Sequence, residues 1–113
     1  MVRIDAVRRV ALSLPGVSEK SHHGVPSFRV ANRIFATVPD DRHLHVMVGS
    51  DEKDLALGAA PGACEELWWG KRLAGVRVNL AVADIHLLGV LLSEAWRQKA
   101  PRRLIGVSEP PNR

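Results

Sequence analysis

Apolar and polar residues alternate along residues 27–48 in three short runs, and turn-forming residues separate the runs. Alternation with a period of two is typical of strands that bury one face. The first turn is Ala31-Asn32, where asparagine tolerates a left-handed backbone, and the second runs from Pro39 to Arg42. The pattern therefore predicts an antiparallel meander with strands at residues 27–30, 33–38 and 43–48.

A helical pattern precedes the meander. Apolar residues recur there at i, i+3, i+4 and i+7, and Pro15-Gly16 stops the pattern. We therefore expect a helix over residues 5–14, with Asp5 as its N-cap. Residues 18–24 lead into the meander either as a short edge strand or as an extended loop.

After the meander, the chain predicts a short helix, two more strands and a long helix. Ser50 or Asp51 is expected to cap the short helix, which runs to residue 59, and Asp84 is expected to cap the long one. Gly89 lies inside the long helix, where glycine costs roughly 1 kcal/mol relative to alanine, so we expect it to permit close contact with the sheet. The segments between the helices are a strand at residues 64–68, a turn region at 70–75 and a last strand at 76–80.

The order of these elements, α-β-β-β-α-β-β-α, predicts an α+β fold. We expect a two-layer sandwich in which helices cover one face of an antiparallel sheet. At 113 residues the chain suits a single domain with one core. We place this domain at residues 1–106, with Pro101 ending the last helix, and expect a flexible C-terminal tail at 107–113 because that segment has little to bury.

The face of the sheet away from the helices is the surface left for function. In the third strand of the meander Leu44, Val46 and Val48 face the helices by alternation, and the opposite side is polar. Solvated strands are polar in any protein, but a face with arginine and histidine also suits contact with phosphate. The residues predicted on this open side are His43, His45, Met47, Arg77 and Asn79, with Arg29 as a further candidate.

The composition is that of an ordinary globular domain, with 46% hydrophobic and 25% charged residues. The apolar runs are shorter than a membrane-spanning helix needs, and the first residues lack the pattern of a signal peptide. The one cysteine, Cys64, excludes an intramolecular disulfide and a multi-cysteine zinc site. We therefore expect a cytoplasmic protein without membrane contact, and an inert Cys64.

Basic residues outnumber acidic ones by 16 to 12, and most of them are arginine. The arginine guanidinium binds phosphate with two parallel hydrogen bonds and stacks on bases. DNA is therefore a candidate partner. The alternative is an arginine-rich composition whose charge merely keeps the domain soluble, and both interpretations stay open because the charge is spread along the chain. Trp68 and Trp69 offer stacking surfaces beside the basic residues. The candidate nucleic-acid-binding residues come from two hairpin regions and are Arg29, Arg33, Lys71, Arg72 and Arg77.

Motifs that would indicate an enzyme or a cofactor site do not occur. Ser27 lacks a nucleophile elbow, no paired carboxylates stand out, and Gly70-Lys71 lacks the other residues of a phosphate loop. His43 and His45 point the same way on a strand, as metal ligands can, but no third ligand accompanies them at a recognisable spacing. We expect no catalytic residue, no metal site and no cofactor.

Several short motifs together carry a family resemblance. They are Leu14-Pro15-Gly16-Val17, His23-Gly24 with Pro26-Ser27-Phe28-Arg29-Val30, Arg33-Ile34-Phe35-Ala36-Thr37, Trp69-Gly70-Lys71 with Val76-Arg77-Val78, and Glu94-Ala95-Trp96 with Ala100-Pro101-Arg102-Arg103-Leu104. Over residues 3–104 the chain resembles the MmcQ/YjbR family. The resemblance implies a compact domain with a fold likened to that of bacterial frataxin (CyaY), and a DNA-binding role, with which members are often labelled.

The resemblance to frataxin does not extend to iron binding. An iron site of that kind would need an acidic first helix, whereas this helix carries Arg8 and Arg9, with Arg3 before them, against Asp5. The segment at residues 72–75 also lacks the aromatic residue that family members commonly place there. We therefore expect neither iron delivery nor a stacking role for that turn.

Two functional hypotheses remain. The leading one is a small non-enzymatic domain that binds DNA without sequence specificity, through its basic hairpins and exposed sheet face. The alternative is a protein-interaction or small-ligand-binding module without catalytic activity, as a monomer or weak dimer. The first requires arginine side chains clustered on one face, and the second requires an apolar concavity or patch.

Overall fold

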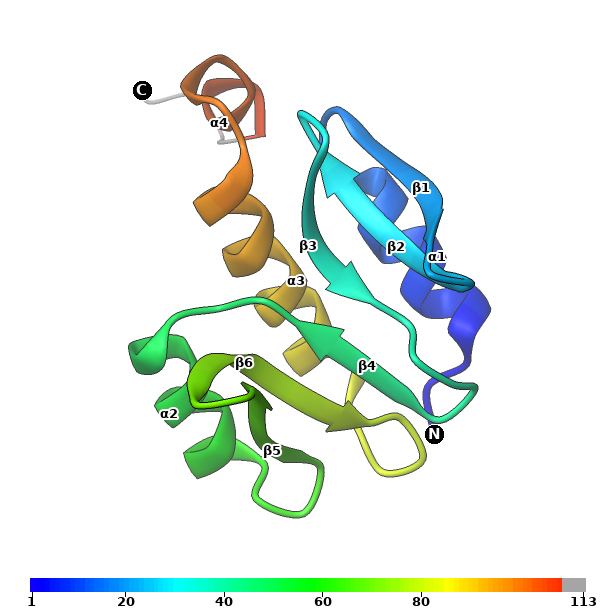
Figure 1. Ribbon diagram of the computed structural model, residues 1–113, viewed down its shortest axis with the longest axis vertical. Helices are drawn as coiled ribbons and strands as arrows, with labels where there is room; N and C mark the ends of the chain where they lie inside the picture. The colour runs from blue at the N-terminus through cyan, green and yellow to red at the C-terminus, as the bar shows by residue number, and fades with distance from the viewer. Residues whose placement is uncertain (109–113) are drawn as a thin grey trace.

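The computed structural model describes residues 1–108 and is built around one six-stranded antiparallel sheet (Figure 1). The strands in chain order are β1 (Val17–His22), β2 (Val25–Val30), β3 (Arg33–Thr37), β4 (His43–Val46), β5 (Cys64–Trp69) and β6 (Arg72–Asn79). Strands β1 to β4 are neighbours in chain order, and β6 lies between β4 and the edge strand β5. The predicted meander is therefore confirmed, and β1 extends it as the edge strand that was one of the two alternatives for residues 18–24.

Helices cover one face of this sheet. Those within residues 1–108 are α1 (Ile4–Ser13), α2 (Ser50–Ala59), α3 (Ile85–Lys99) and α4 (Arg102–Ser108). Figure 1 looks onto the open face of the sheet, with α1 and α3 behind it. Between the layers, Phe28, Leu44 and Val76 of the sheet and Leu92 and Trp96 of α3 are buried. The α+β two-layer sandwich is therefore confirmed. No helix in the described part of the chain is both long and apolar enough to cross a membrane.

Helix α4 is the main difference from the predicted order, because the sequence predicted no helix after Pro101. Proline is favourable at the start of a helix. Pro101 follows the C-cap of α3 and directly precedes α4, and its carbonyl accepts a hydrogen bond from the Leu104 N–H (3.0 Å) in the first turn of α4. Leu104 packs against Gly16, where an added Cβ would come within 2.8 Å of the leucine side chain. Of the predicted tail, residues 107 and 108 belong to α4, and residues 109–113 lie outside the described residues.

The predicted N-caps are right for α3 and wrong for α1. The Asp84 carboxylate accepts a hydrogen bond from the Leu87 N–H (3.2 Å) and caps α3. Arg3, not Asp5, occupies the N-cap position of α1. Asp5 lies in the first turn and contacts Arg8 one turn later (3.2 Å), so its carboxylate still lies at the positive end of the helix dipole.

Helix α2 begins without a side-chain cap. Gly49 occupies its N-cap position, so neither Ser50 nor Asp51 is the cap that the sequence predicted. Asp51 and Glu52 instead lie in the first turn, where carboxylates complement the exposed backbone N–H groups and the helix dipole.

The hairpin between β5 and β6 is tighter than predicted. The sequence predicted a turn over residues 70–75, whereas only Gly70 and Lys71 form the turn and β6 begins at Arg72. Gly70 has a φ of 62°, which favours glycine. A β-bulge leaves Ala74 without a partner in β5, and pairing then continues to the end of the hairpin.

Gly89 does not serve the close contact that the sequence predicted. A Cβ at this position of α3 would meet nothing within 4 Å. Glycine in a helix interior costs about 0.5–1 kcal/mol relative to alanine, so Gly89→Ala should raise the free energy of unfolding by about that amount. Urea denaturation measures this difference, and a loss of stability would contradict the open space described here.

Candidate nucleic-acid interface

The strand register determines which side chains lie on the open face of the sheet. Directly paired residues of antiparallel neighbours share a face. One such row crosses the sheet through β2, β3, β4, β6 and β5, and it consists of Ser27, Thr37, His45, Arg77 and Glu65. His43 pairs with Asn79 on the same side. The predicted open-side positions of these histidines, Arg77 and Asn79 are therefore confirmed.

Charge differs between the two faces of the sheet. On the helix side, Glu19 lies 2.7 Å from the Arg8 guanidinium and Glu66 lies 2.8 Å from the Lys53 ammonium. The hydrogen bond from Lys53 lowers the pKa of Glu66. The charged side chains that the strands place on the open face are Lys20, Arg29, Arg72, Arg77 and one acid, Glu65. We call the four basic residues the open-face cations; within residues 1–108 none of them forms an ion pair.

Three of the five predicted binding residues reach the open face. They are Arg29, Arg72 and Arg77. Lys71 lies in the turn between β5 and β6. Arg33 pairs with Val30, which is buried under the helices, so Arg33 lies on the other side of the sheet. The two hairpins do not bring the five residues together, because the β2–β3 tip and the β5–β6 tip lie apart, at the top and the left of Figure 1.

Lys20 is an open-face cation that the sequence analysis did not single out. It pairs with Ser27 and so lies on the same face. Alternation within residues 18–24 would have placed it there once the segment was interpreted as a strand. Because an extended loop remained an alternative for residues 18–24, the face of Lys20 was not predicted.

A hollow of about 410 Å³ lies on the open face. Its polar lining consists of His22, His23, Thr37 and His45. Its apolar lining consists of Val25, Ile34, Pro39, Met47 and Trp69. The volume lies within the range of about 300–1,000 Å³ that is usual for small-ligand sites, and the mixture of apolar walls with a few polar groups is typical of them. We call this site the open-face hollow.

Trp68 and Trp69 are equally exposed, at 50% and 51%, but project to opposite sides of β5. Trp69 forms part of the open-face hollow. The Trp68 Nε1–H donates to the Glu66 carboxylate (3.1 Å), which also accepts from Lys53 of α2, so Trp68 lies at the helix side. Of the two tryptophans predicted to offer stacking surfaces, only Trp69 is on the open face.

Arg77 and His45 form a directed contact at the centre of this face. Arg77 Nη1 lies 2.7 Å from His45 Nε2. A guanidinium can only donate, so Nε2 accepts and the proton of the neutral imidazole is on Nδ1. Burial, followed by the positive charge of Arg77, lowers the pKa of His45. The contact holds the Arg77 guanidinium over β4, beside the hollow.

The lowered pKa of His45 predicts a loss of stability in mild acid. Between the ordinary value of 6.5 and the lower folded-state value, the unfolded chain binds more protons, so the free energy of unfolding falls as the pH falls through that window. In His45→Gln this contribution is absent, and the other histidines are unchanged. Urea denaturation from pH 7 to about 5 should therefore give a flatter profile for the variant. Equal slopes for both proteins would contradict a neutral His45.

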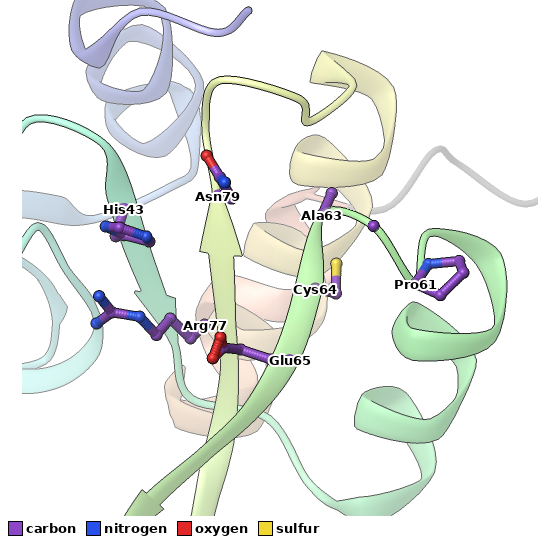
Figure 2. Close-up of a pocket in the computed structure, with 8 residues that line it drawn as sticks. His43, Pro61, Ala63, Cys64, Glu65, Arg77 and Asn79 are labelled. Carbon is purple, nitrogen blue, oxygen red and sulfur yellow. The ribbon is translucent and has the colours of Figure 1, made fainter.

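A smaller polar pocket of about 140 Å³ lies near the end of the same face (Figure 2). Figure 2 shows Glu65 pointing across β6 toward Arg77, whose guanidinium extends over β4. His43 lines this pocket, and its Nδ1 lies 3.0 Å from the Asp40 carboxylate. The pKa of Asp40 is lowered, first by the backbone N–H of Arg42 and then by His43. The Asp40 carboxylate therefore already has hydrogen-bond partners within its own loop and in His43.

Cys64 of β5 and Ser27 of β2 are potential nucleophiles, and each has its own surroundings. Burial raises the pKa of the Cys64 thiol, which disfavours the reactive thiolate. The Ser27 hydroxyl donates to the Lys20 carbonyl (2.8 Å) and accepts from Arg29 Nε (3.2 Å), and neither partner is a general base. In residues 1–108 no group of three His, Cys, Asp or Glu side chains is placed to hold a metal ion.

Comparison with known proteins decides the family. The family model YjbR matches residues 12–98, most of the chain. The chain belongs to the YjbR family. Its structure is similar to the crystal structure of the Deinococcus radiodurans protein DR2400, which has a DUF419 domain, with a TM-score of 0.73 and 20% identity over 95% of this chain and 88% of that chain. This likeness shows the fold alone. No curated protein matches the chain.

The YjbR domain has a second apolar concavity on its helix side. A groove of about 360 Å³ runs between α2 and α3. Leu55 and Val90 line it and are 75% and 62% exposed, with Glu52 and Glu94 also in its lining. The apolar surface that the interaction-module hypothesis requires is therefore present in two places, this groove and the open-face hollow.

Proposed function

We propose that the open sheet face of this YjbR domain binds nucleic acid without sequence specificity and without catalysis. The observation that carries the proposal is the uneven charge of the sheet. Within residues 1–108 its open face has four cations that form no ion pair and one acid, while the helix-side acids Glu19 and Glu66 are paired. Arginines that form no ion pair and are spread over a strand face suit repeated phosphate contacts.

Lack of sequence specificity follows from the kind of surface involved. Base readout in a duplex needs a helix or a narrow ribbon that enters the major groove. The open face is a broad sheet, with its helices on the other side (Figure 1). Phosphate contacts set position and affinity but carry no sequence information. A cytoplasmic location, expected from the single cysteine, stays part of this proposal.

A salt titration tests the proposal. Fluorescence anisotropy of a labelled oligonucleotide should report binding at about 50 mM salt, and the logarithm of the association constant should fall linearly with the logarithm of salt concentration. Contacts from three or four cations predict a slope of about −2 to −3 for a single strand. Absence of binding at low salt, or binding that salt does not weaken, would contradict phosphate contact.

The open-face hollow favours a second candidate function, the binding of a small planar apolar ligand. Five of its nine lining residues are apolar, and they include Met47 and Trp69. Apolar burial is only weakly sensitive to moderate salt, in contrast to phosphate contact. A ligand that raises the melting temperature equally at low and high salt, in a domain that shows no oligonucleotide binding, would favour this candidate.

A further inference from the structure

We infer that the open-face hollow receives one unpaired base of a single-stranded nucleic acid, stacked on Trp69, and that the domain therefore prefers single strands to duplex. The inference rests on the proposed function and specifies its substrate. The first observation is that Trp69 is half-exposed: it lines the hollow and is not part of the buried core.

The surroundings of Trp69 suit a planar group that carries a phosphate. Arg72 pairs directly with Trp69 across the β5–β6 hairpin and shares its face. Arg77 is held toward β4 by His45, which lines the same hollow. An exposed aromatic side chain on a positively charged surface is one arrangement by which proteins bind single strands, because bases stack on the ring while the cations meet the backbone.

The other lining residues of the hollow suit the rest of a base. Ile34 and Met47 provide apolar contact, and Met47 is itself only 7% exposed. His22 and Thr37 add polar groups that can donate or accept at a base edge. These polar groups are few, and each can pair with a donor or an acceptor on any base, which agrees with binding that depends little on sequence.

Duplex DNA does not suit this site. Its bases are stacked on one another and present only their edges in the grooves, so no flat ring is free to lie on Trp69. Placing a duplex base in the hollow would require unstacking and unpairing, at a cost of a few kcal/mol. A single strand makes the same phosphate contacts without that cost.

A matched pair of variants tests the inference. Trp69→Leu and Trp68→Leu change neighbouring tryptophans of equal exposure, but only Trp69 borders the hollow. Anisotropy at constant low salt is measured for a single strand, for the same sequence as duplex, and for an abasic strand with the same number of phosphates. Wild type should bind the intact strand about 5- to 100-fold more tightly than the abasic one. Trp69→Leu should lose this preference, and Trp68→Leu should keep it.

The outcomes separate this inference from the proposed function. If wild type binds the intact and abasic strands equally, the stacking inference is wrong while salt-dependent binding still supports the open face. That comparison needs no variant, so it holds even if Trp69→Leu does not fold. A wild-type preference for duplex also overturns the inference. If no strand binds at low salt, the proposed function fails and the inference fails with it.

Discussion

Replacing Arg29, Arg72 and Arg77 with alanine should weaken the binding of a single-stranded oligonucleotide at low salt by roughly 100-fold. The three side chains lie on the open face, and none of them has a carboxylate partner within residues 1–108. A phosphate contact of about 1 kcal/mol for each arginine gives about 3 kcal/mol in total. The salt dependence should also become shallower by about 2 units of slope, because three counterion-releasing contacts are lost.

A second triple variant controls for net charge. Arg9, Arg102 and Arg103 are exposed on α1 and α4, outside the open face, and their replacement by alanine removes the same charge. Binding should then fall only slightly, through the weaker long-range field. Arg33→Ala, on the helix side of β3, should behave in the same way. Equal losses in the two triple variants would mean that overall charge, and not the open face, determines binding. Circular dichroism confirms that each variant is folded.

Gly75→Ala should be among the most destabilising single substitutions in the chain. Gly75 has a φ of 156°, and an added Cβ would lie 1.9 Å from the Val46 carbonyl oxygen and 2.9 Å from the Val48 nitrogen. Both are backbone atoms, so no side-chain rotation can relieve the clash. Strand β6 would have to separate from the segment that contains β4 and the residues after it. We expect a loss of at least about 3 kcal/mol in the free energy of unfolding, measured by urea denaturation.

The same substitution at Gly89 is the matched control. Both variants add one methyl group, but Gly89 has open space around it and should gain stability. A loss of stability for Gly75→Ala together with a gain for Gly89→Ala would support the close approach of β4 and β6 that holds His45 beside Arg77. A Gly75→Ala variant within about 0.5 kcal/mol of wild type would contradict that packing.

Local patterns in the sequence predict much of this fold. The hairpin at Ala31-Asn32 is confirmed, with φ values of 50° and 64° that match a tight two-residue turn. Helix α3 is also confirmed. It was predictable because its cap, Asp84, and its apolar stripe lie within a few helical turns of each other in the sequence. Turn chemistry and periodicity act between near neighbours, so a single sequence is enough to read them.

The faces of Arg33, Ile34 and Arg72 could not be predicted, because two β-bulges change the alternation. In β3, Phe35 has no partner in β2, which moves Arg33 to the helix side and Ile34 to the open face. In β6, Ala74 has no partner in β5. This bulge turns Arg72 to the open face, whereas the bulge in β3 turns Arg33 away from it. A bulge arises from pairing between strands and has no local sequence mark in this chain.

The open-face hollow was beyond sequence analysis for a related reason. Its lining comes from five strands, the β1–β2 turn, the loop that follows β3 and the residue after β4, and it assembles only when β6 inserts between β4 and β5. Contacts between distant segments leave no periodic signal. The YjbR resemblance was readable because it depends on short motifs, whereas the frataxin likeness and the DNA-binding label stay predictions.

The most direct test of the open face as the binding surface is a nuclear magnetic resonance titration of ¹⁵N-labelled protein with a single-stranded oligonucleotide. The three tryptophan indole N–H signals are internal probes. Trp69 reports on the open face, Trp68 on the helix side and Trp96 on the core. The account predicts that the Trp69 signal shifts together with the amides of Arg72, Arg77 and His45, while the signals of Trp68 and Trp96 stay in place. Shifts centred on the groove between α2 and α3, or no shifts at low salt, would contradict it.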